Sequence, residues 1–172
     1  MIHLCRLLLI SSLFFLTQAN AAFNGLSVES QPTNLSSHMQ RDRWTLVAIW
    51  SLDCVTCEQQ KPDLSAINTR LGNLTVVGLS IDGTDQMKAV RNRLAKRPVS
   101  FDNIVLNYGD FAAEYEQRFQ RPYTATPTYI LFNPDYEVKS INVGPLDFST
   151  LETYLKKNTK AANVRHGADL MR

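Results

Sequence analysis

A length of 172 residues and an apolar content of 44% limit the chain to one globular domain of ordinary size with a proper core. The formal net charge of +2 gives no electrostatic reason to expect nucleic acid as a partner. The sequence contains no internal repeat and no low-complexity tract, which excludes solenoid and fibrous classes.

The first 21 residues are predicted to be a secretory signal peptide. Residues 1–6 carry one positive charge, residues 7–16 are almost wholly apolar, and Ala19-Asn20-Ala21 offers small residues at the spacing of a cleavage site. We expect cleavage after Ala21 and a periplasmic or otherwise exported protein without stable membrane insertion. An uncleaved membrane anchor is the alternative, and the short apolar run disfavours it because spanning takes roughly 20 residues.

Signal cleavage also changes the cysteine count. Cys5 precedes the apolar run, so it does not resemble a lipid-attachment cysteine, and the mature chain keeps only Cys54 and Cys57. An exported protein meets an oxidising compartment, where such a pair is normally oxidised unless a partner reduces it.

The mature chain, expected to form one domain over residues 22–157, begins with a short edge strand near Phe23 to Val28, and Asn34 can cap a short helix through Gln40. Trp44 to Trp50 is a continuous apolar, β-favouring run, the pattern of a strand covered on both faces.

A helix is predicted after Cys57, because Leu64, Ile67 and Leu71 recur at helical spacing and Gly72-Asn73 supplies a stop. Pro62 lies inside this helix and should kink it. The other faces are expected to carry its polar residues: Glu58, Gln59, Lys61, Asp63 and Arg70.

The middle of the chain predicts strand and helix in alternation. Residues 74–81 form a buried strand, the turn 82–85 caps a helix over 86–96, residues 101–106 form a short strand, and Asp110 caps a helix over 111–119. This order indicates a right-handed βαβ unit and a parallel core sheet. Asp82, Asp85 and Asp110 are interpreted as turn and cap residues rather than as an acid–base pair.

The last part predicts an antiparallel hairpin and a helix. Strands over 128–132 and 136–143 are joined by the tight turn 133–135. Ser149 and Glu152 have the spacing of a capping box for a final helix through Lys157. The tail, residues 158–172, lacks apolar periodicity and is expected to be flexible.

Cys54 and Cys57 lie where the first buried strand gives way to a helix, and a helix start favours a thiolate. A purely structural bridge is disfavoured because so small a loop restrains the unfolded chain little. For metal, the pair supplies half of a site, and His38 and His166 are each interpreted as ordinary surface histidines. No metal and no cofactor are therefore expected.

A strand, a Cys-x-x-Cys opening a helix, and a later Thr-Pro before a hairpin and a terminal helix resemble the thioredoxin fold. More closely, the chain is similar to exported thioredoxin-like proteins of the TlpA/ResA type, whose pattern is Trp-x-x-x-Cys-x-x-Cys-x-x-Glu-x-Pro. Trp50, Cys54, Cys57 and Pro62 stand at the matching spacings, and Pro127-Thr128 matches the family's cis-proline segment. The resemblance covers most of residues 44–157.

This resemblance implies an α/β domain with a central mixed sheet flanked by helices and an inserted helix-strand-helix segment between residues 84 and 119. It implies a thiol-disulfide oxidoreductase in which Cys54 attacks and Cys57 resolves. Pro127 would be cis beside the dithiol, Thr126 would pair with an extended substrate chain, and Trp50 would pack beneath the pair and contribute to substrate binding.

The partners implied are protein thiol or disulfide clients and an upstream membrane or periplasmic redox partner. Cytochrome c maturation is among the pathways of this family. The chain is expected to act as a monomer.

Two departures from the family pattern alter the electrostatics of the pair. Asp53 replaces the residue before the first cysteine, commonly Trp, and should oppose a Cys54 thiolate, so at most a modest depression of its pKa is expected. Gln60 replaces the family's acidic residue and removes a candidate proton acceptor.

Two alternatives stay open: a copper- or zinc-binding module that uses the two thiolates, and a redox-inert thioredoxin-like interaction domain, which the changes at Asp53 and Gln60 make conceivable. A peroxidase of the peroxiredoxin type is disfavoured because no Pro-x-x-x-Thr-x-x-Cys stretch occurs. A basic group near the end of the helix predicted over 86–96 is interpreted as a solvated helix end, and a docking face for an acidic partner is the alternative. Its members are Arg91, Arg93, Lys96 and Arg97.

Overall fold

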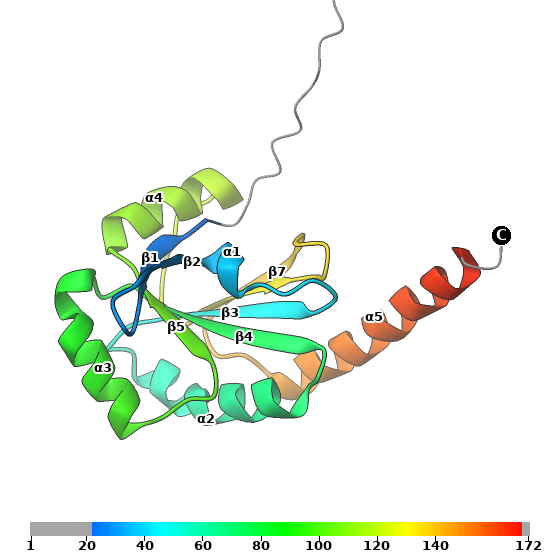
Figure 1. The fold of residues 1–172 in the computed structure, drawn as a ribbon, viewed down its shortest axis with the longest axis horizontal. Coiled ribbons are helices and arrows are strands. Elements are labelled where there is room, and N and C mark those ends of the chain that lie inside the picture. The colour runs from blue at the N-terminus through cyan, green and yellow to red at the C-terminus, as the bar shows by residue number, and fades with distance from the viewer. Residues whose placement is uncertain (1–21, 170–172) are drawn as a thin grey trace, which may run out of the picture.

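The computed structural model describes residues 22–169. Within them one seven-stranded sheet runs in the order β2-β1-β5-β4-β3-β6-β7, with helices on both faces (Figure 1). The predicted signal peptide, residues 1–21 with Cys5, lies outside the described residues and stays a prediction.

The centre of the sheet is the apolar run that the sequence singled out. β3 (Trp44–Trp50) is buried at all seven positions. It pairs in parallel with β4 (Leu74–Ser80) and antiparallel with β6 (Thr128–Phe132). β4 in turn pairs in parallel with β5 (Asp102–Val105), which confirms the predicted parallel core.

The two edges of the sheet differ. β7 (Val138–Val143) pairs antiparallel with β6, which confirms the predicted hairpin. At the other edge the sequence predicted one strand, but the structure has an antiparallel pair, β1 (Asn24–Ser27) and β2 (Pro32–Asn34). α1 (Leu35–His38) follows β2, and the side chain of Asn34 caps it as predicted.

The remaining helices cover the two faces. α2 (Val55–Arg70) follows β3, the single turn η1 (Thr84–Gln86) leads into α3 (Met87–Lys96), α4 (Tyr108–Phe119) follows β5, and α5 (Phe148–Asp169) ends the fold. The α3-β5-α4 segment is the predicted insertion.

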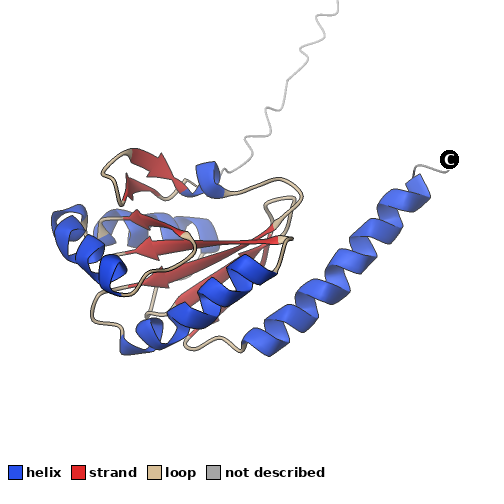
Figure 2. Cartoon of the chain, turned by 60° about the horizontal axis from the view of Figure 1, so that its bottom comes forward, coloured by secondary structure: helices blue, strands red, loops and turns tan. Residues whose placement is uncertain are grey.

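Alternation along β3 divides the core into two layers. Val47 and Ile49 pack with the apolar residues of α4, whereas Leu46 and Ala48 pack with those of α2 and α5. Figure 2 shows α2 and α5 together on one side of the sheet. Both ends of β3 are thereby fixed, so the loop that follows Trp50 starts from a rigid platform.

Two predicted helix caps are wrong. Asn107, not Asp110, is the N-cap position of α4, and Asp110 lies in the first turn. The α5 start is capped by Asp147, which accepts hydrogen bonds from the backbone N–H groups of Ser149 and Thr150. Asp, Ser and Asn all cap well, so composition alone could not choose among neighbours.

α5 also continues beyond Lys157, where the sequence predicted its end. Residues 158–166 contain neither proline nor glycine, so nothing in the local sequence stops the helix there. Figure 1 shows this part of α5 running out beyond the sheet.

Candidate active site

Cys54 and Cys57 form a disulfide at the start of α2, with their Cα atoms 5.2 Å apart. Cys54 is the N-cap residue of the helix, and its Sγ accepts a hydrogen bond from the Cys57 N–H at 3.1 Å. Cys54 is 8% exposed and Cys57 is 3% exposed. Val55 between them is 70% exposed, so the pair lies just beneath an apolar surface residue.

Trp50, the last residue of β3, forms the floor of the site. It is 2% exposed and belongs to one buried cluster with both cysteines and with Met87 and Val90 of α3. Its Nε1–H donates to the Asn103 side-chain oxygen at 3.0 Å. This burial places Trp50 beneath the disulfide and not on the surface that a client would touch.

The predicted proline loop lies beside the pair. The Thr126-Pro127 peptide bond is cis, as predicted. The Thr126 and Ser51 hydroxyl oxygens are 3.5 Å apart, which ties this loop to the one before Cys54. Pro127 and Cys57 line the same small cavity. The structure therefore brings all five predicted site residues together.

Asp82 holds the loop between β3 and the disulfide. One oxygen of its carboxylate accepts the Leu52 N–H at 2.9 Å, and the other accepts the Ser80 hydroxyl at 2.6 Å. The interpretation of Asp82 as a turn residue is confirmed. It lies in the turn that follows β4, and its carboxylate also holds the loop that precedes the cysteines.

Lys61 was missed. The sequence placed it on an outer face of α2, but it is 4% exposed and lines the cavity that Cys57 lines. Its Nζ lies 2.5 Å from a Glu58 carboxylate oxygen and 3.5 Å from the centroid of the Trp50 ring. The sequence spacing could have indicated this, because Lys61 follows Cys57 by four residues and positions i and i+4 of a helix share a face.

The carboxylate of Glu58 gathers three cations. Besides Lys61 it contacts Arg93 at 3.3 Å and Arg97 at 3.5 Å, both from the end of α3. Burial alone would raise the pKa of Glu58, but the hydrogen bonds and charges of Lys61 and Arg93 outweigh it and lower that pKa. Burial lowers the pKa of Lys61 more strongly than Glu58 raises it.

The interpretation of the basic group on α3 as a solvated helix end is therefore wrong for Arg93, whose side chain is 33% exposed and paired with Glu58. Arg97 also pairs with Glu58, but its side chain stays 65% exposed. Arg93 also donates to the Leu52 carbonyl oxygen at 2.9 Å, one residue before Asp53. The basic end of α3 thus contacts the segment that carries the cysteines, which helix composition alone cannot reveal.

Gln60, which replaces the family's acidic residue, has a structural role. Its side chain donates to the Leu146 carbonyl oxygen and accepts from the Leu146 N–H and from the Tyr129 hydroxyl, at 2.9, 3.0 and 2.6 Å. Burial raises the pKa of Tyr129, which keeps this hydroxyl a donor.

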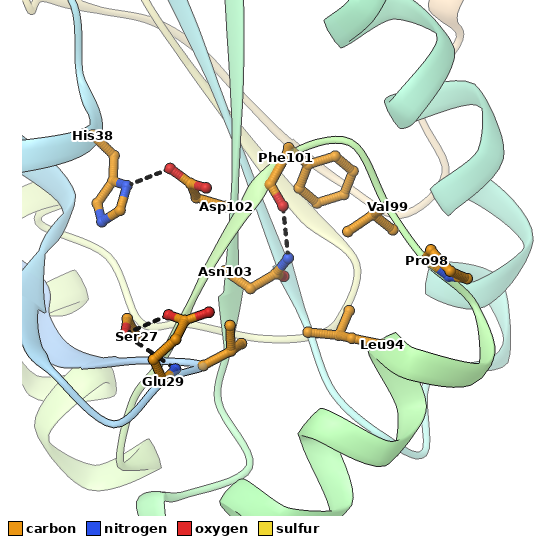
Figure 3. Close-up of a pocket in the computed structure, with 10 residues that line it drawn as sticks. Ser27, Glu29, His38, Leu94, Pro98, Val99, Phe101, Asp102 and Asn103 are labelled. Carbon is orange, nitrogen blue, oxygen red and sulfur yellow. Dashed lines mark hydrogen bonds and ion pairs between the residues drawn. The ribbon is translucent and has the colours of Figure 1, made fainter.

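A second cavity, of about 300 Å³, lies away from the disulfide among β1, α1, α3 and β5 (Figure 3). His38 and Asp102 lie on one of its sides, 2.9 Å apart, and apolar residues including Leu94 and Phe101 lie on the other. Among the residues that the structure describes, no cluster of three or more His, Cys, Asp or Glu has the arrangement of a metal site. His38 is half-buried and hydrogen-bonded to Asp102 rather than a free surface residue.

Comparison with known proteins agrees with this geometry. The model of the AhpC/TSA family matches residues 17–141. No curated protein matches the chain.

Within residues 22–169, no helix has both the length and the apolar character needed to cross a bilayer.

Solved structures share the fold at low sequence identity. A thiol:disulfide interchange protein of the thioredoxin family from Chlorobium tepidum is 17% identical, with a TM-score of 0.66 over 81% of this chain and 94% of that one. A secreted disulfide oxidoreductase from Mycobacterium tuberculosis, homologous to DsbE, is 17% identical, with a TM-score of 0.62 over 78% and 94%. The exposed lipoprotein thioredoxin of Streptococcus pneumoniae is 16% identical, with a TM-score of 0.63 over 80% and 99%. These matches confirm the predicted mixed α/β thioredoxin-like fold.

Proposed function

The chain belongs to the AhpC/TSA family, and from that premise we propose that it is an exported thiol-disulfide oxidoreductase that exchanges disulfides with protein clients through Cys54 and Cys57. The single observation that carries the proposal is the disulfide at the N-terminus of α2, with Cys54 as the N-cap and the cis Pro127 loop beside it. The thioredoxin-like fold and the family are consistent with oxidoreductase activity.

The geometry supports different roles for the two sulfurs. Cys54 is the more exposed, and the Cys57 N–H together with the helix dipole faces its sulfur, which favours a thiolate there. Cys57 lies one turn further into α2 and is covered, so it is suited to attack Cys54 rather than a large client.

The exchange balances without a cofactor. The Cys54 thiolate attacks a client disulfide, an S–S bond forms between Cys54 and the client, and the other client sulfur leaves as a thiolate that takes a proton. Cys57 then loses its proton and attacks Cys54, which re-forms the Cys54–Cys57 bond and releases the second client thiol. The protein dithiol is oxidised and the client disulfide is reduced; the reverse sequence oxidises a client.

The surface around the pair suits an extended client segment. Val55 next to Cys54 and Val143 at the end of β7 are exposed apolar residues, and Val143 is the register partner of Thr128 just after the cis bond. Thr126, half-buried at the start of this loop, is the residue whose backbone would pair with the client. The apolar side chains would cover the client on either side of the reacting sulfur.

Export and the pathway are part of the proposal. The signal-peptide pattern of residues 1–21 supports export, as do the secreted and surface-exposed structural neighbours. An envelope redox pathway such as cytochrome c maturation would supply both clients and the upstream redox partner.

Reduction of insulin by dithiothreitol tests the activity. The full chain should accelerate precipitation of the insulin B chain, Cys54→Ser should abolish the acceleration, and Cys5→Ser should leave it unchanged because Cys5 lies outside the domain. A rate for Cys54→Ser equal to that of the unaltered chain would exclude the proposal.

A peroxide assay separates disulfide exchange from peroxidase chemistry within the same family. Because the chain lacks the peroxidatic Pro-x-x-x-Thr-x-x-Cys stretch, hydrogen peroxide consumption should stay at the level of the Cys54→Ser variant. Rapid Cys54-dependent peroxide turnover with no insulin reduction would assign the chain to the peroxidases instead.

A further inference from the structure

Among the residues that the structure describes, Lys61 is the only Lys, Arg, Asp or Glu that is buried. Burying an ammonium group away from water is costly unless a nearby negative charge compensates it. Glu58 supplies that compensation in the oxidised protein, but disulfide exchange creates new negative charge at this very place.

Lys61 and Cys57 lie on the same face of α2, one helical turn apart. Both line a cavity of about 10 Å³, which is at the lower limit for a single water molecule. No bulk solvent therefore separates the ammonium group from the Cys57 sulfur, and the Trp50 ring, whose centroid is 3.5 Å from Nζ, lines the same cavity. In such surroundings charges interact much more strongly than in water.

The charged groups facing Lys61 leave an excess of positive charge. Glu58 is shared among Lys61, Arg93 and Arg97, so one carboxylate meets three cations. The other acidic group that acts on Lys61 is Asp82, so two carboxylates stand against the three cations. The site can therefore accept one further negative charge.

We propose that Lys61 is the counter-charge of the Cys57 thiolate. The inference rests on the proposed function. Lys61 acts when Cys57 loses its proton to solvent and attacks the Cys54 sulfur; it forms no covalent bond. Asp53 and Glu58 oppose the effect, but Asp53 is exposed whereas Lys61 is buried.

A titration of Cys57 tests the proposal. In the full chain carrying Cys5→Ala and Cys54→Ala, Cys57 is the only thiol, and its ionisation can be followed by thiolate absorbance and by the pH dependence of alkylation. Lys61→Met should raise the pKa of Cys57 by about one to three units, which is the usual effect of removing a close opposite charge. Lys88→Met, which removes an exposed lysine of α3, should leave it unchanged.

A charge-retaining variant separates charge from packing. Lys61→Arg should keep the Cys57 pKa within about half a unit of the parent, whereas Lys61→Gln should raise it as Lys61→Met does. Circular dichroism on every variant identifies any that fails to fold. If Lys61→Met does not fold, Lys61→Gln serves as the neutral variant in its place.

The outcomes are distinct from those of the proposed function. If the Cys57 pKa is the same in folded Lys61→Met and Lys61→Gln as in the parent, Lys61 is not the counter-charge, whatever the insulin assay shows. If the pKa rises but the unaltered chain reduces no disulfide, the counter-charge stands and the oxidoreductase activity fails.

Discussion

At the scale of single residues, Gln60 joins three parts of the fold through one amide. It connects α2 to the backbone of Leu146 before α5 and to the Tyr129 hydroxyl on β6. Tyr129 is 2% exposed, so removing Gln60 takes a hydrogen-bond partner from a hydroxyl on a buried residue. The substitution of the family's acid at this position thus has a structural use.

Gln60→Leu should lower the free energy of unfolding by about 2–4 kcal/mol, because three hydrogen bonds are lost and a buried hydroxyl is left unpaired. Its neighbour Gln59 is exposed, and Gln59→Leu should change stability by less than about 0.5 kcal/mol. Urea denaturation of both variants gives the comparison. Equal effects of the two would show that the Gln60 contacts contribute nothing.

Restoring the acid makes stability depend on pH. In Gln60→Glu one carboxyl oxygen would face the Leu146 carbonyl oxygen, so the acid must stay protonated to donate there, and its pKa should rise above the unfolded value. A raised carboxyl pKa favours folding at low pH, and that contribution is lost as the pH rises. Relative to the unaltered chain, the variant should be about 1–3 kcal/mol less stable at pH 8 than at pH 4. A pH-independent difference in urea unfolding would contradict this.

Local pattern placed Cys54 and Cys57 where a buried strand runs into a helix start, which periodicity and length reveal. The roles of Trp50, Thr126 and Pro127 came only from the resemblance to the family, and neither source showed how the charges of the site are arranged. The burial of Lys61 depends on Trp50 and on α3, whose contacts with α2 are set by tertiary packing. The partners of Gln60 lie 69 and 86 positions away, and no local pattern specifies them.

At the scale of elements, the start of α5 is set by one carboxylate. Asp147 accepts from the hydroxyl and backbone N–H groups of both Thr150 and Ser149, which lower its pKa to about 2 from an ordinary value of 3.8. Ser149 donates to Asp147 instead of capping the helix itself. The capping-box pattern therefore found the correct turn of the chain but the wrong residue.

The depressed pKa of Asp147 predicts a specific acid effect. Its contribution to stability is complete above pH 3.8 and is lost as the pH falls through about 2. Asp147→Asn keeps a capping side chain without the charge, so the unaltered chain should be the more stable at pH 6 and should lose that advantage by pH 2. Urea midpoints across this range measure the difference. A gap that stays constant with pH would show that the charge of Asp147 has no part in it.

Glu152, the other half of the predicted box, instead joins α5 to α2. It accepts from Arg70 at 2.8 Å, and Arg70 is the last residue of α2. α5 is thus held to the domain by this ion pair and by its buried residues Leu151 and Leu155. These contacts explain how a helix that starts after the hairpin covers the same face as α2.

At the scale of the whole molecule, the predicted domain of residues 22–157 contains every strand of the sheet and both buried leucines of α5. A chain ending at Asn158 should therefore have a free energy of unfolding within about 1 kcal/mol of that of the full chain. Leu155→Ala in the full chain should cost about 2–5 kcal/mol, because it opens a cavity against β3 and β6.

Urea denaturation of the truncated chain and of the Leu155→Ala variant gives the contrast. If truncation destabilises as much as Leu155→Ala does, the domain extends into the later part of α5 and the predicted boundary is wrong.

The fold as a whole places the two sulfurs at one end of the central strands, where β3 ends and the loop before β6 begins its return. A resolving thiol in the same helical turn would distinguish client exchange from a one-cysteine reaction, and the proposed intermediate is a mixed disulfide on Cys54. Trapping that intermediate tests the central claim most directly.

In a Cys5→Ala background, reduced Cys57→Ser mixed with a client protein that carries an intact disulfide should accumulate a covalent adduct, because the Cys54 thiolate displaces one client sulfur and no second thiol resolves the mixed disulfide. Mass spectrometry should locate the linkage at Cys54. Cys54→Ser should accumulate none. An adduct that forms equally in both variants, or in neither, would contradict disulfide exchange through this pair.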